Sequence, residues 1–452
     1  MTKNQGASMF PRLVPLAVLT ACGPATLAVV AAQAQTAAPP PNPTPSPAPN
    51  PAYGRENPPG VGGPATIPGK PIETRPPERA DEKPAFPQQT RAPYAKSVDY
   101  QVTVVTDKLK NPWSLAFLPD GSCLVTEREN PSAIRIVSRD GVVSSPLTGL
   151  DGLAAPGKLG LLEVALDPQF DRTKRVFFTF FERFEKGYSN TFVGRAVLDE
   201  GALALKDVVV LLRTKPEAPV ENFSTKQGGR IVFAKDRTMF VTTGDRDGVG
   251  EPWKVAQELD NHLGKLLHID RDGKPARDNP FIGKAGALPE IWAYGFRTNQ
   301  GLATDPNTGL LWASDQGPRG GDELNLIRKG ANYGWPIITY GINYSGKVVG
   351  EGLTAKEGME QPIYFWDPVI AASGLAFYSG SLFPEWKDSA FVAGLRGQMV
   401  TRLKIKDNKV VEEEALLVDQ KARMRAVRVG PDGALYVLAE PNKLLRITPK
   451  RN

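Results

Sequence analysis

The feature of this sequence that most limits its fold is a short module that recurs six times. Each copy holds a strand of alternating apolar and polar residues, a turn rich in Asp, Pro or Gly, and a second strand. The copies begin at Pro112, Leu159, Gly228, Asn299, Ala372 and Met424. They are roughly 45 to 75 residues apart, which is close to the repeat length of propeller blades.

Between the modules, helical signals are almost absent. A ring of blades lets each blade bury both faces against its neighbours and leaves only short, protected edges. We therefore predict an all-β protein with a single six-bladed β-propeller over residues 98–452, preceded by a disordered Pro-rich segment. A pair of β-sandwiches is the alternative, but it does not explain the repeated module.

The first 34 residues are typical of an export signal. A weakly basic start is followed by an apolar run rich in small residues and by Ala-Gln-Ala at 32–34. Pro15 and Pro24 interrupt that run and disfavour a retained membrane helix. We expect a periplasmic or secreted protein. The segment LTAC also resembles a lipoprotein processing site, and lipid on Cys22 would be the only route to a membrane.

Residues 35–97 are predicted to be a disordered, Pro-rich linker. Many of the 42 prolines of the chain lie here, and large apolar residues are too few to offset the entropy of ordering. Such a composition favours an extended, semi-rigid spacer.

Charge and cysteine usage exclude several classes of function. The formal charge of +6 is scattered along the chain without interleaved aromatic residues, so nucleic acid is not an expected partner. If Cys22 leaves with the signal, Cys123 is the only thiol, which excludes an intramolecular disulfide and a cysteine metal cluster. Cys123 lies in an alternating apolar run, and we expect it to be buried.

The stretch SDQGPRGGDELNLI, residues 314–327, departs from simple turn composition. The Gly317-Pro318 step cannot fully join a sheet ladder, so its carbonyls are free to point elsewhere. Asp322 and Glu323 follow, and Ca²⁺ takes six to eight oxygen ligands of these two kinds. A solvated acidic turn, a metal loop and an anion cradle all remain open on composition alone.

Positive charge recurs at the boundaries of the modules, at Arg297, Arg396, Arg423 and Arg425. Boundaries on different blades can converge at one end of the central channel. Guanidinium groups bind carboxylates bidentately, so converging arginines suit an anion with several carboxylates. A surface role is the alternative for any single one of them.

Several segments together resemble the soluble quinoprotein glucose dehydrogenase family, and more closely its aldose sugar dehydrogenase branch. They include NPWSLAFLPDG, LGLLEVALDP, ALPEIWAYGFR, DQGPRGGDELNLI followed by NYGWP, and GPDGALYVL. The resemblance covers residues 100–448. It implies a six-bladed propeller that binds pyrroloquinoline quinone (PQQ) and Ca²⁺, oxidises the C1 hydroxyl of an aldose, and passes electrons to an artificial or respiratory acceptor.

The resemblance also implies roles for individual residues. Gly317 and Pro318 match positions whose carbonyls hold the cofactor Ca²⁺, with Asp322 and Glu323 at acidic positions of the same loop. The implied cofactor contacts are Arg297, the Arg423–Arg425 pair, and Arg396, where the family has a lysine or another polar residue. Lys158 and Thr298 replace a family glutamine near the substrate and the asparagine after the arginine.

The expected catalytic histidine is replaced. The family segment that carries this general base aligns with STKQGGRIVF, which places Lys226 at the histidine position. The chain has only two histidines. His262 matches a stretch outside the catalytic set, and His268 alternates within a strand, where a structural role is expected. Three hypotheses remain: a PQQ enzyme with Lys226 as base or with a changed substrate, a non-catalytic propeller that binds PQQ, Ca²⁺ or a sugar-like ligand, and a scaffold with an empty channel.

Overall fold

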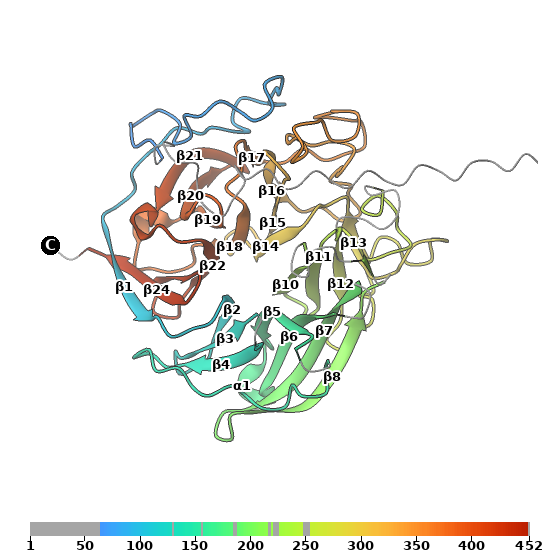
Figure 1. Cartoon of the computed structure of the whole chain (residues 1–452), viewed down its shortest axis with the longest axis vertical. Helices are drawn as coiled ribbons and strands as arrows, with labels where there is room; N and C mark the ends of the chain where they lie inside the picture. Colours follow the sequence, from blue (N-terminus) through green and yellow to red (C-terminus); the bar gives the residue numbers. More distant parts are fainter. Residues whose placement is uncertain are drawn as a thin grey trace, which may run out of the picture. The chain divides into compact units, whose positions relative to one another are not determined.

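The structure is a computed structural model that describes residues 64–128, 131–154, 157–183, 188–215, 218–219, 226–246 and 254–450. The expected signal at 1–34 and residues 35–63 of the expected linker lie outside these ranges. Six antiparallel sheets are arranged around a central axis (Figure 1). The prediction of an all-β, six-bladed propeller is confirmed.

The strands of the six blades follow in chain order. Blade 1 contains β2 (Pro112–Phe117), β3 (Cys123–Glu127) and β4 (Ala133–Val137), and blade 2 contains β5 (Leu159–Leu166), β6 (Arg175–Arg183), β7 (Tyr188–Asp199), β8 (Ala204–Arg213) and the short β9 (Ala218–Pro219). Blade 3 contains β10 (Gly228–Phe233), β11 (Met239–Thr243), β12 (Lys265–Ile269) and β13 (Ile291–Tyr294), and blade 4 contains β14 (Asn299–Thr304), β15 (Leu311–Asp315), β16 (Asp322–Leu326) and β17 (Tyr364–Trp366). Blade 5 contains β18 (Ala372–Phe377), β19 (Ser389–Gly394), β20 (Met399–Lys406) and β21 (Lys409–Leu416), and blade 6 contains β22 (Met424–Val429), β23 (Leu435–Ala439), β24 (Lys443–Pro449) and β1 (Tyr100–Thr106).

The first strand of each module is the innermost strand of its blade. These six strands contact one another in the order β2, β5, β10, β14, β18 and β22, and β22 contacts β2 again. Strands within the blades are covered on both faces, and β3, β11 and β15 are buried along their whole length. Apolar residues therefore occupy both faces of these strands, which gives the short apolar runs seen in the sequence.

The first and last strands of the propeller pair with each other and close the ring. Strand β1 forms the outer edge of blade 6, antiparallel to β24, with Tyr100 opposite Pro449 and Val102 opposite Ile447. The sequence did not indicate this pairing, because the two strands are joined by the whole propeller. Helical structure among the described residues is limited to α1 (Phe170–Thr173) and to 3₁₀ turns such as η3 (Pro384–Trp386) and η4 (Val418–Gln420).

The linker prediction is wrong for residues 64–97, which we call the N-terminal strap. This segment runs along blades 4 and 5, beside β17 and β21 (Figure 1). Ile72, Ala92 and Tyr94 are buried in one apolar cluster with side chains of both blades. The backbone of Gln89 accepts a hydrogen bond from the Phe365 N–H, and Tyr94 forms a bridge to Glu413 in β21. A few well-placed apolar residues and backbone hydrogen bonds thus order a segment whose composition suggested disorder.

The remaining observations on the fold concern Cys123 and the membrane. Cys123 is buried and free, as expected, and burial raises the pKa of its thiol to about 12. Among the residues that the structure describes, no helix is long and apolar enough to span a bilayer.

Candidate functional site

The blade topology brings the predicted site residues to one end of the channel. Each blade's innermost strand begins at this end, and its antiparallel neighbour ends there. We call the loops before the first strands and after the second strands the mouth. The loops before first strands contain Lys158, Lys226, Arg297, Thr298 and Arg423, and those after second strands contain Gly317, Pro318 and Arg396.

Arg297 is a buried cation of the mouth, and its side chain binds the backbone of the Gly-rich loop. Its Nη1 donates hydrogen bonds to the carbonyl oxygens of Gln316 (2.9 Å) and Gly317 (2.8 Å). The guanidinium lies 5.5 Å from the ring centroid of Trp335 and 5.9 Å from that of Tyr344. Its Nε is buried and has no hydrogen-bond partner among the residues that the structure describes. Within this part of the chain, Arg297 therefore keeps one donor available for a further acceptor.

Asp315 holds the backbone of Arg297 and Thr298 in place. Its two carboxylate oxygens accept hydrogen bonds from the N–H groups of Arg297 (2.8 Å) and Thr298 (2.5 Å). Burial raises the pKa of Asp315 to about 7, and these two hydrogen bonds oppose the rise. Thr298, which replaces the family's asparagine after the arginine, contacts the protein in two ways: its N–H donates to Asp315, and its hydroxyl accepts from Gln300 Nε2 (3.2 Å).

Lys226 lies in the loop before β10, next to this group. Its backbone is left-handed, with φ of 57°, and its carbonyl packs against Gly244. Burial lowers the pKa of the Lys226 ammonium, the charge of Arg297 acts in the same direction, and Asp245 and Asp315 oppose them, with a net pKa of about 7. A lysine with such a pKa has a large neutral fraction near pH 7 and can accept a proton there.

The Gly-rich loop Gln316–Gly321 follows β15 at the mouth. The Gly317 carbonyl already accepts a hydrogen bond from a cation, Arg297, so its oxygen is directed at the place where positive charge is held. Asp322 Oδ1 accepts from the Gly317 N–H (2.9 Å) and Oδ2 from the Ala372 N–H (3.0 Å), which ties the loop to blade 5. Asp322 thus supports the loop through its backbone.

Asp322 and Glu323 do not form a pair of ligands for one ion. They are consecutive in β16, so their side chains point to opposite faces of the blade. Glu323 lies opposite Asp315, accepts a hydrogen bond from Asn325, and has its pKa raised to about 8 by burial and then by the charge of Asp315. In the described part of the chain, no three His, Cys, Asp or Glu side chains are grouped to hold a metal ion. A cation at the mouth would therefore depend on backbone carbonyls, as expected for Gly317 and Pro318, and on its ligand.

The glycines of this loop are required by close packing. A Cβ on Gly321 would lie 2.4 Å from the Gly341 nitrogen, and one on Gly317 would lie 2.2 Å from the Gly320 carbonyl oxygen. Gly321 also has φ of +71°, which costs an alanine roughly 1–2 kcal/mol by itself. The loop can keep its course only with glycine at these positions.

We expect Gly321→Ala to shift the loop and to weaken Ca²⁺-dependent PQQ binding by at least about tenfold, or roughly 1.4 kcal/mol. Fluorescence titration of the purified variant with PQQ at fixed Ca²⁺ measures this. Gly286→Ala is the matched control, because Gly286 has φ of +74° but nothing within 4 Å of the added Cβ. Equal affinities for the Gly321→Ala variant and the unmodified protein would contradict the importance of this close packing.

Arg423 and Arg425 are already paired with an acid. Their Nε atoms each donate to Glu440, at 2.8 Å, from opposite sides of its carboxylate. Burial opposes ionisation, but the charges of Arg425 and Arg423 outweigh it and lower the pKa of Glu440 to about 2. The three groups carry one net positive charge, so the pair offers less charge to an anion than the sequence suggested. The sequence analysis did not single out Glu440, which directly follows the second strand of blade 6.

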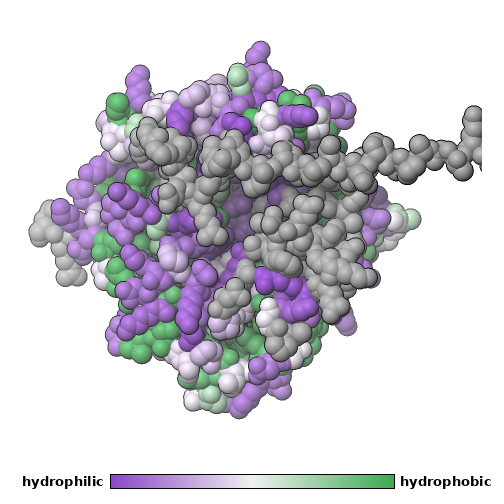
Figure 2. Space-filling view, viewed as in Figure 1, coloured by the Kyte–Doolittle hydropathy of each residue, from purple (hydrophilic) through white to green (hydrophobic). Residues whose placement is uncertain are grey.

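Two further cations of the mouth were missed. Arg128 and Arg246 follow the second strands of blades 1 and 3, in CLVTER and VTTGDR. The guanidinium of Arg128 lies over the Phe181 ring, and that of Arg246 is buried, with its pKa lowered to about 10 by burial. Their position after a second strand, shared with Arg396, is the signal that would have identified them. Figure 2 shows hydrophilic residues gathered near the centre of the ring on the viewed face.

The other predicted residues lie at the edges of this arrangement. Lys158 is partly buried before β5, and its carbonyl accepts from the Arg183 N–H. The Arg396 backbone N–H donates to the Ile370 carbonyl, and the Arg396 side chain is partly buried.

His268 stacks on Phe240 and hydrogen-bonds to Thr238 and Asn279, which confirms a structural role. His262 Nδ1 accepts from the Lys215 N–H, so its position in blade 3 is also fixed by the fold.

Comparisons with known proteins match this chain to one family. The family model described as Glucose / Sorbosone dehydrogenase matches residues 109–446. Aldose sugar dehydrogenase YliI of Escherichia coli (strain K12) is 38% identical over 361 residues, covering 79% of this chain and 95% of that protein. The apo crystal structure of the soluble aldose sugar dehydrogenase from Escherichia coli is 37% identical, with a TM-score of 0.72, covering 78% of this chain and 100% of that one. The PQQ-bound aldose sugar dehydrogenase from Streptomyces coelicolor is 28% identical, with a TM-score of 0.62, covering 79% and 100%.

Proposed function

This chain belongs to the glucose/sorbosone dehydrogenase family, and from the chemistry of its mouth we propose that it is a PQQ- and Ca²⁺-dependent sugar dehydrogenase. Its reaction would be oxidation of the C1 hydroxyl of an aldose or a related sugar. The observation that carries the proposal is the contact of Arg297 with the Gly317 carbonyl, because it places an anion-binding donor and a cation-binding oxygen at one point.

The residues present fit both groups. PQQ is a planar tricarboxylate, and it needs several cations and aromatic surfaces. Arg297, whose buried Nε has no partner among the described residues, would supply one cation, and the rings of Trp335 and Tyr344 beside it would supply the aromatic surface. One relative of similar fold has been solved in a PQQ-bound form. Arg396, Arg423 and Arg425 would contribute further positive charge, while the Gly317 and Pro318 carbonyls would hold Ca²⁺. With Ca²⁺ in place, Arg297 would release or share the Gly317 oxygen.

Each residue of the mouth has a separate part in the proposed reaction. When bound, PQQ would supply an acceptor for the hydride of the sugar C1. Neutral Lys226 would accept the proton of the C1 hydroxyl at its Nζ, replacing the histidine that the family uses. Burial and the charge of Arg297 lower the pKa of Lys226 to about 7, so a large fraction of it would be neutral near pH 7 and able to take this role.

The export signal expected at residues 1–34 supports a proposal about where the reaction takes place. We propose that the protein acts in the periplasm or outside the cell, and that a respiratory or artificial acceptor reoxidises the cofactor. Attachment to a membrane would require lipid on Cys22.

Replacement of the family's histidine by Lys226 also favours a second candidate, a propeller that binds PQQ and Ca²⁺ without turnover. Reconstitution separates the two. The purified protein is loaded with Ca²⁺ and PQQ, and reduction of a dye is followed with a panel of aldoses. Dye reduction that depends on sugar, PQQ and Ca²⁺ supports the enzyme. Micromolar PQQ binding without reduction supports the second candidate, and absence of binding at micromolar PQQ rejects both.

A further inference from the structure

We propose that the N-terminal strap is a positioning element for the loop Gln316–Gly321. The inference rests on the proposed function, which assigns this loop to the cation. The strap comprises residues 64–97 and lies outside the part of the chain that the family model matches, residues 109–446.

One ion pair joins the strap directly to the loop. Glu78 Oε2 accepts hydrogen bonds from Arg319 Nε (2.7 Å) and pairs with Arg319 Nη2 (2.5 Å). The two side chains are 21% and 26% exposed, so water screens the pair only in part. Arg319 directly follows Pro318, and the pair therefore acts on the peptide that carries a proposed cation ligand.

A second connection passes through Asp367, which is buried beneath the loop. The N–H groups of Glu78 and Arg79 donate to the two oxygens of the Asp367 carboxylate, at 3.0 and 3.1 Å. That carboxylate lies against Gly320, since a Cβ there would meet its atoms at 2.6–2.9 Å. We call Asp367 the first wall of the loop, and the strap holds it through these two hydrogen bonds.

The strap also contacts a second segment that packs against the loop, residues 339–342, which we call the second wall. Arg79 is 6% exposed, and its Nη1 donates to the carbonyl of Thr339 (3.1 Å), while its Nη2 donates to that of Gly352. Two residues beyond Thr339, Gly341 packs against Gly320 and Gly321. Ile342 and Arg319 then exchange two backbone hydrogen bonds, of 3.1 and 2.7 Å. The loop is enclosed between two walls that share the strap as their support.

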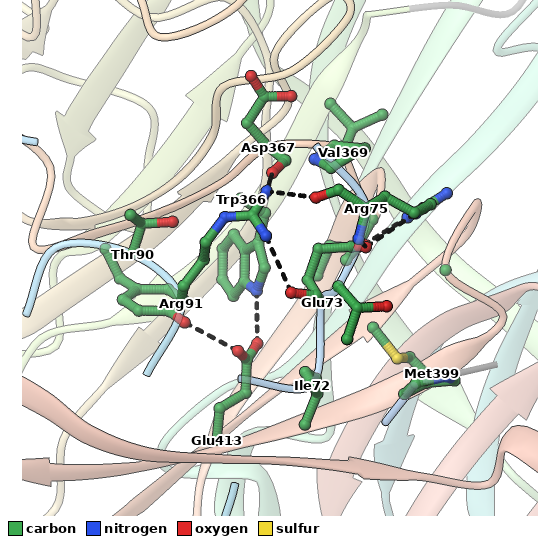
Figure 3. A pocket seen from close by; sticks show the side chains of 16 residues that line it. Ile72, Glu73, Arg75, Thr90, Arg91, Trp366, Asp367, Val369, Met399 and Glu413 are labelled. Atoms are coloured by element: carbon green, nitrogen blue, oxygen red, sulfur yellow. Dashed lines mark hydrogen bonds and ion pairs between the residues drawn. The ribbon is translucent and has the colours of Figure 1, made fainter. Parts of the chain in front are cut away.

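The strap is itself anchored at separate points. Arg91 donates to the carbonyls of Glu73 (2.9 Å), Arg75 (2.8 Å) and Asp367 (2.8 Å), as Figure 3 shows. A cavity of about 60 Å³ remains between the strap and blades 4 and 5, lined by Glu73, Trp366 and Met399 among others. Because this attachment relies on discrete polar contacts, one contact can be removed while the apolar anchors keep the strap in place.

The consequence for binding is preorganisation. A loop that is already ordered loses less entropy when it takes up a cation, so it binds the cation more tightly. Loosening the strap at Glu78 should reduce affinity without changing any group that touches the ligand.

The test compares Glu78→Ala with Ser97→Ala. Ser97 also ties the strap to a blade, through Glu414, but its contacts lie outside the loop and its two walls. Two readouts are taken: hydrogen–deuterium exchange of the amides of residues 316–321, and the dissociation constants of Ca²⁺ alone and of PQQ with Ca²⁺. We expect Glu78→Ala to speed exchange in the loop and to weaken both ligands by about fivefold or more, the usual lower range for coupled sites. Ser97→Ala should change neither, and the charge-reversed pair Glu78→Arg with Arg319→Glu should restore both.

Each outcome decides a separate question. Unchanged exchange in Glu78→Ala, or faster exchange with unchanged affinities, would overturn the positioning role. If the unmodified protein binds neither Ca²⁺ nor PQQ, the proposed function fails, and the exchange data still decide whether the strap orders the loop.

Discussion

A Lys226→Met variant is expected to lose sugar turnover by about a hundred- to ten-thousand-fold, the range that a general base contributes. The variant should still bind PQQ at pH 8 with an affinity close to that of the unmodified protein. At that pH Lys226 is mostly neutral, because burial and Arg297 lower its pKa to about 7, and methionine therefore removes little charge. Steady-state dye reduction and PQQ titration, measured on the same preparation, separate the base from the binding site.

The pH dependence gives a second readout for the same residue. Lys226 can accept a proton only when deprotonated, so the rate should rise as pH increases through about 7. Lys226→His introduces the residue type that the family resemblance implies at this position, and it should retain turnover with a midpoint nearer 6.5, the ordinary pKa of histidine. Turnover by Lys226→Met at an undiminished rate would show that another group removes the proton.

A second prediction concerns the free energy of unfolding and depends on charged side chains at the centre of the ring. Glu163 in β5 accepts hydrogen bonds from Arg230 Nη1 (3.1 Å), Arg428 Nη2 (3.0 Å) and the Ser114 hydroxyl. Arg230 is buried under Trp113, at 3.9 Å from the ring centroid, and its Nε donates to the Gln300 carbonyl. These contacts join the innermost strands of four blades, 1, 2, 3 and 6, and reach a fifth through Gln300 in β14.

We expect Glu163→Ala to lower the free energy of unfolding by about 3–5 kcal/mol, because it leaves the Arg230 guanidinium buried without its counter-charge. Urea titration measures the loss. The double variant Glu163→Met with Arg230→Met should recover most of it, since it removes both fully buried charges and leaves without a counter-charge only Arg428, whose side chain is 23% exposed. A loss below about 1 kcal/mol in Glu163→Ala would instead assign the pair the weak contribution of a solvent-exposed ion pair.

The arrangement of the blades could be predicted because it depends on local patterns. All six predicted modules begin at the first residue of an innermost strand, from Pro112 in β2 to Met424 in β22. Strand alternation and turn composition act over a few residues, so they are visible without any knowledge of the tertiary structure. The same positional regularity placed Arg297 at the mouth, whereas Lys226 was singled out by the family resemblance.

Contacts between distant segments could not be predicted in this way. The strap depends on Ile72 and Tyr94 meeting blades 4 and 5, and β1 depends on a partner at the other end of the propeller. At the site, the sequence grouped Asp322 with Glu323, but the alternation of β16 separates their side chains. Glu440 was missed because its importance comes from two arginines that precede it by a whole hairpin.

The central claim is that a sugar transfers hydride to PQQ held at this mouth. The most direct measurement mixes the Ca²⁺- and PQQ-loaded protein with excess aldose in the absence of oxygen and dye, and follows the absorbance of the bound cofactor. We expect reduction of one PQQ per protein in a single phase, with a rate constant that rises as the pH increases through about 7. The Lys226→Met variant should show no such reduction. Bound PQQ that stays oxidised with every aldose tested would contradict the claim.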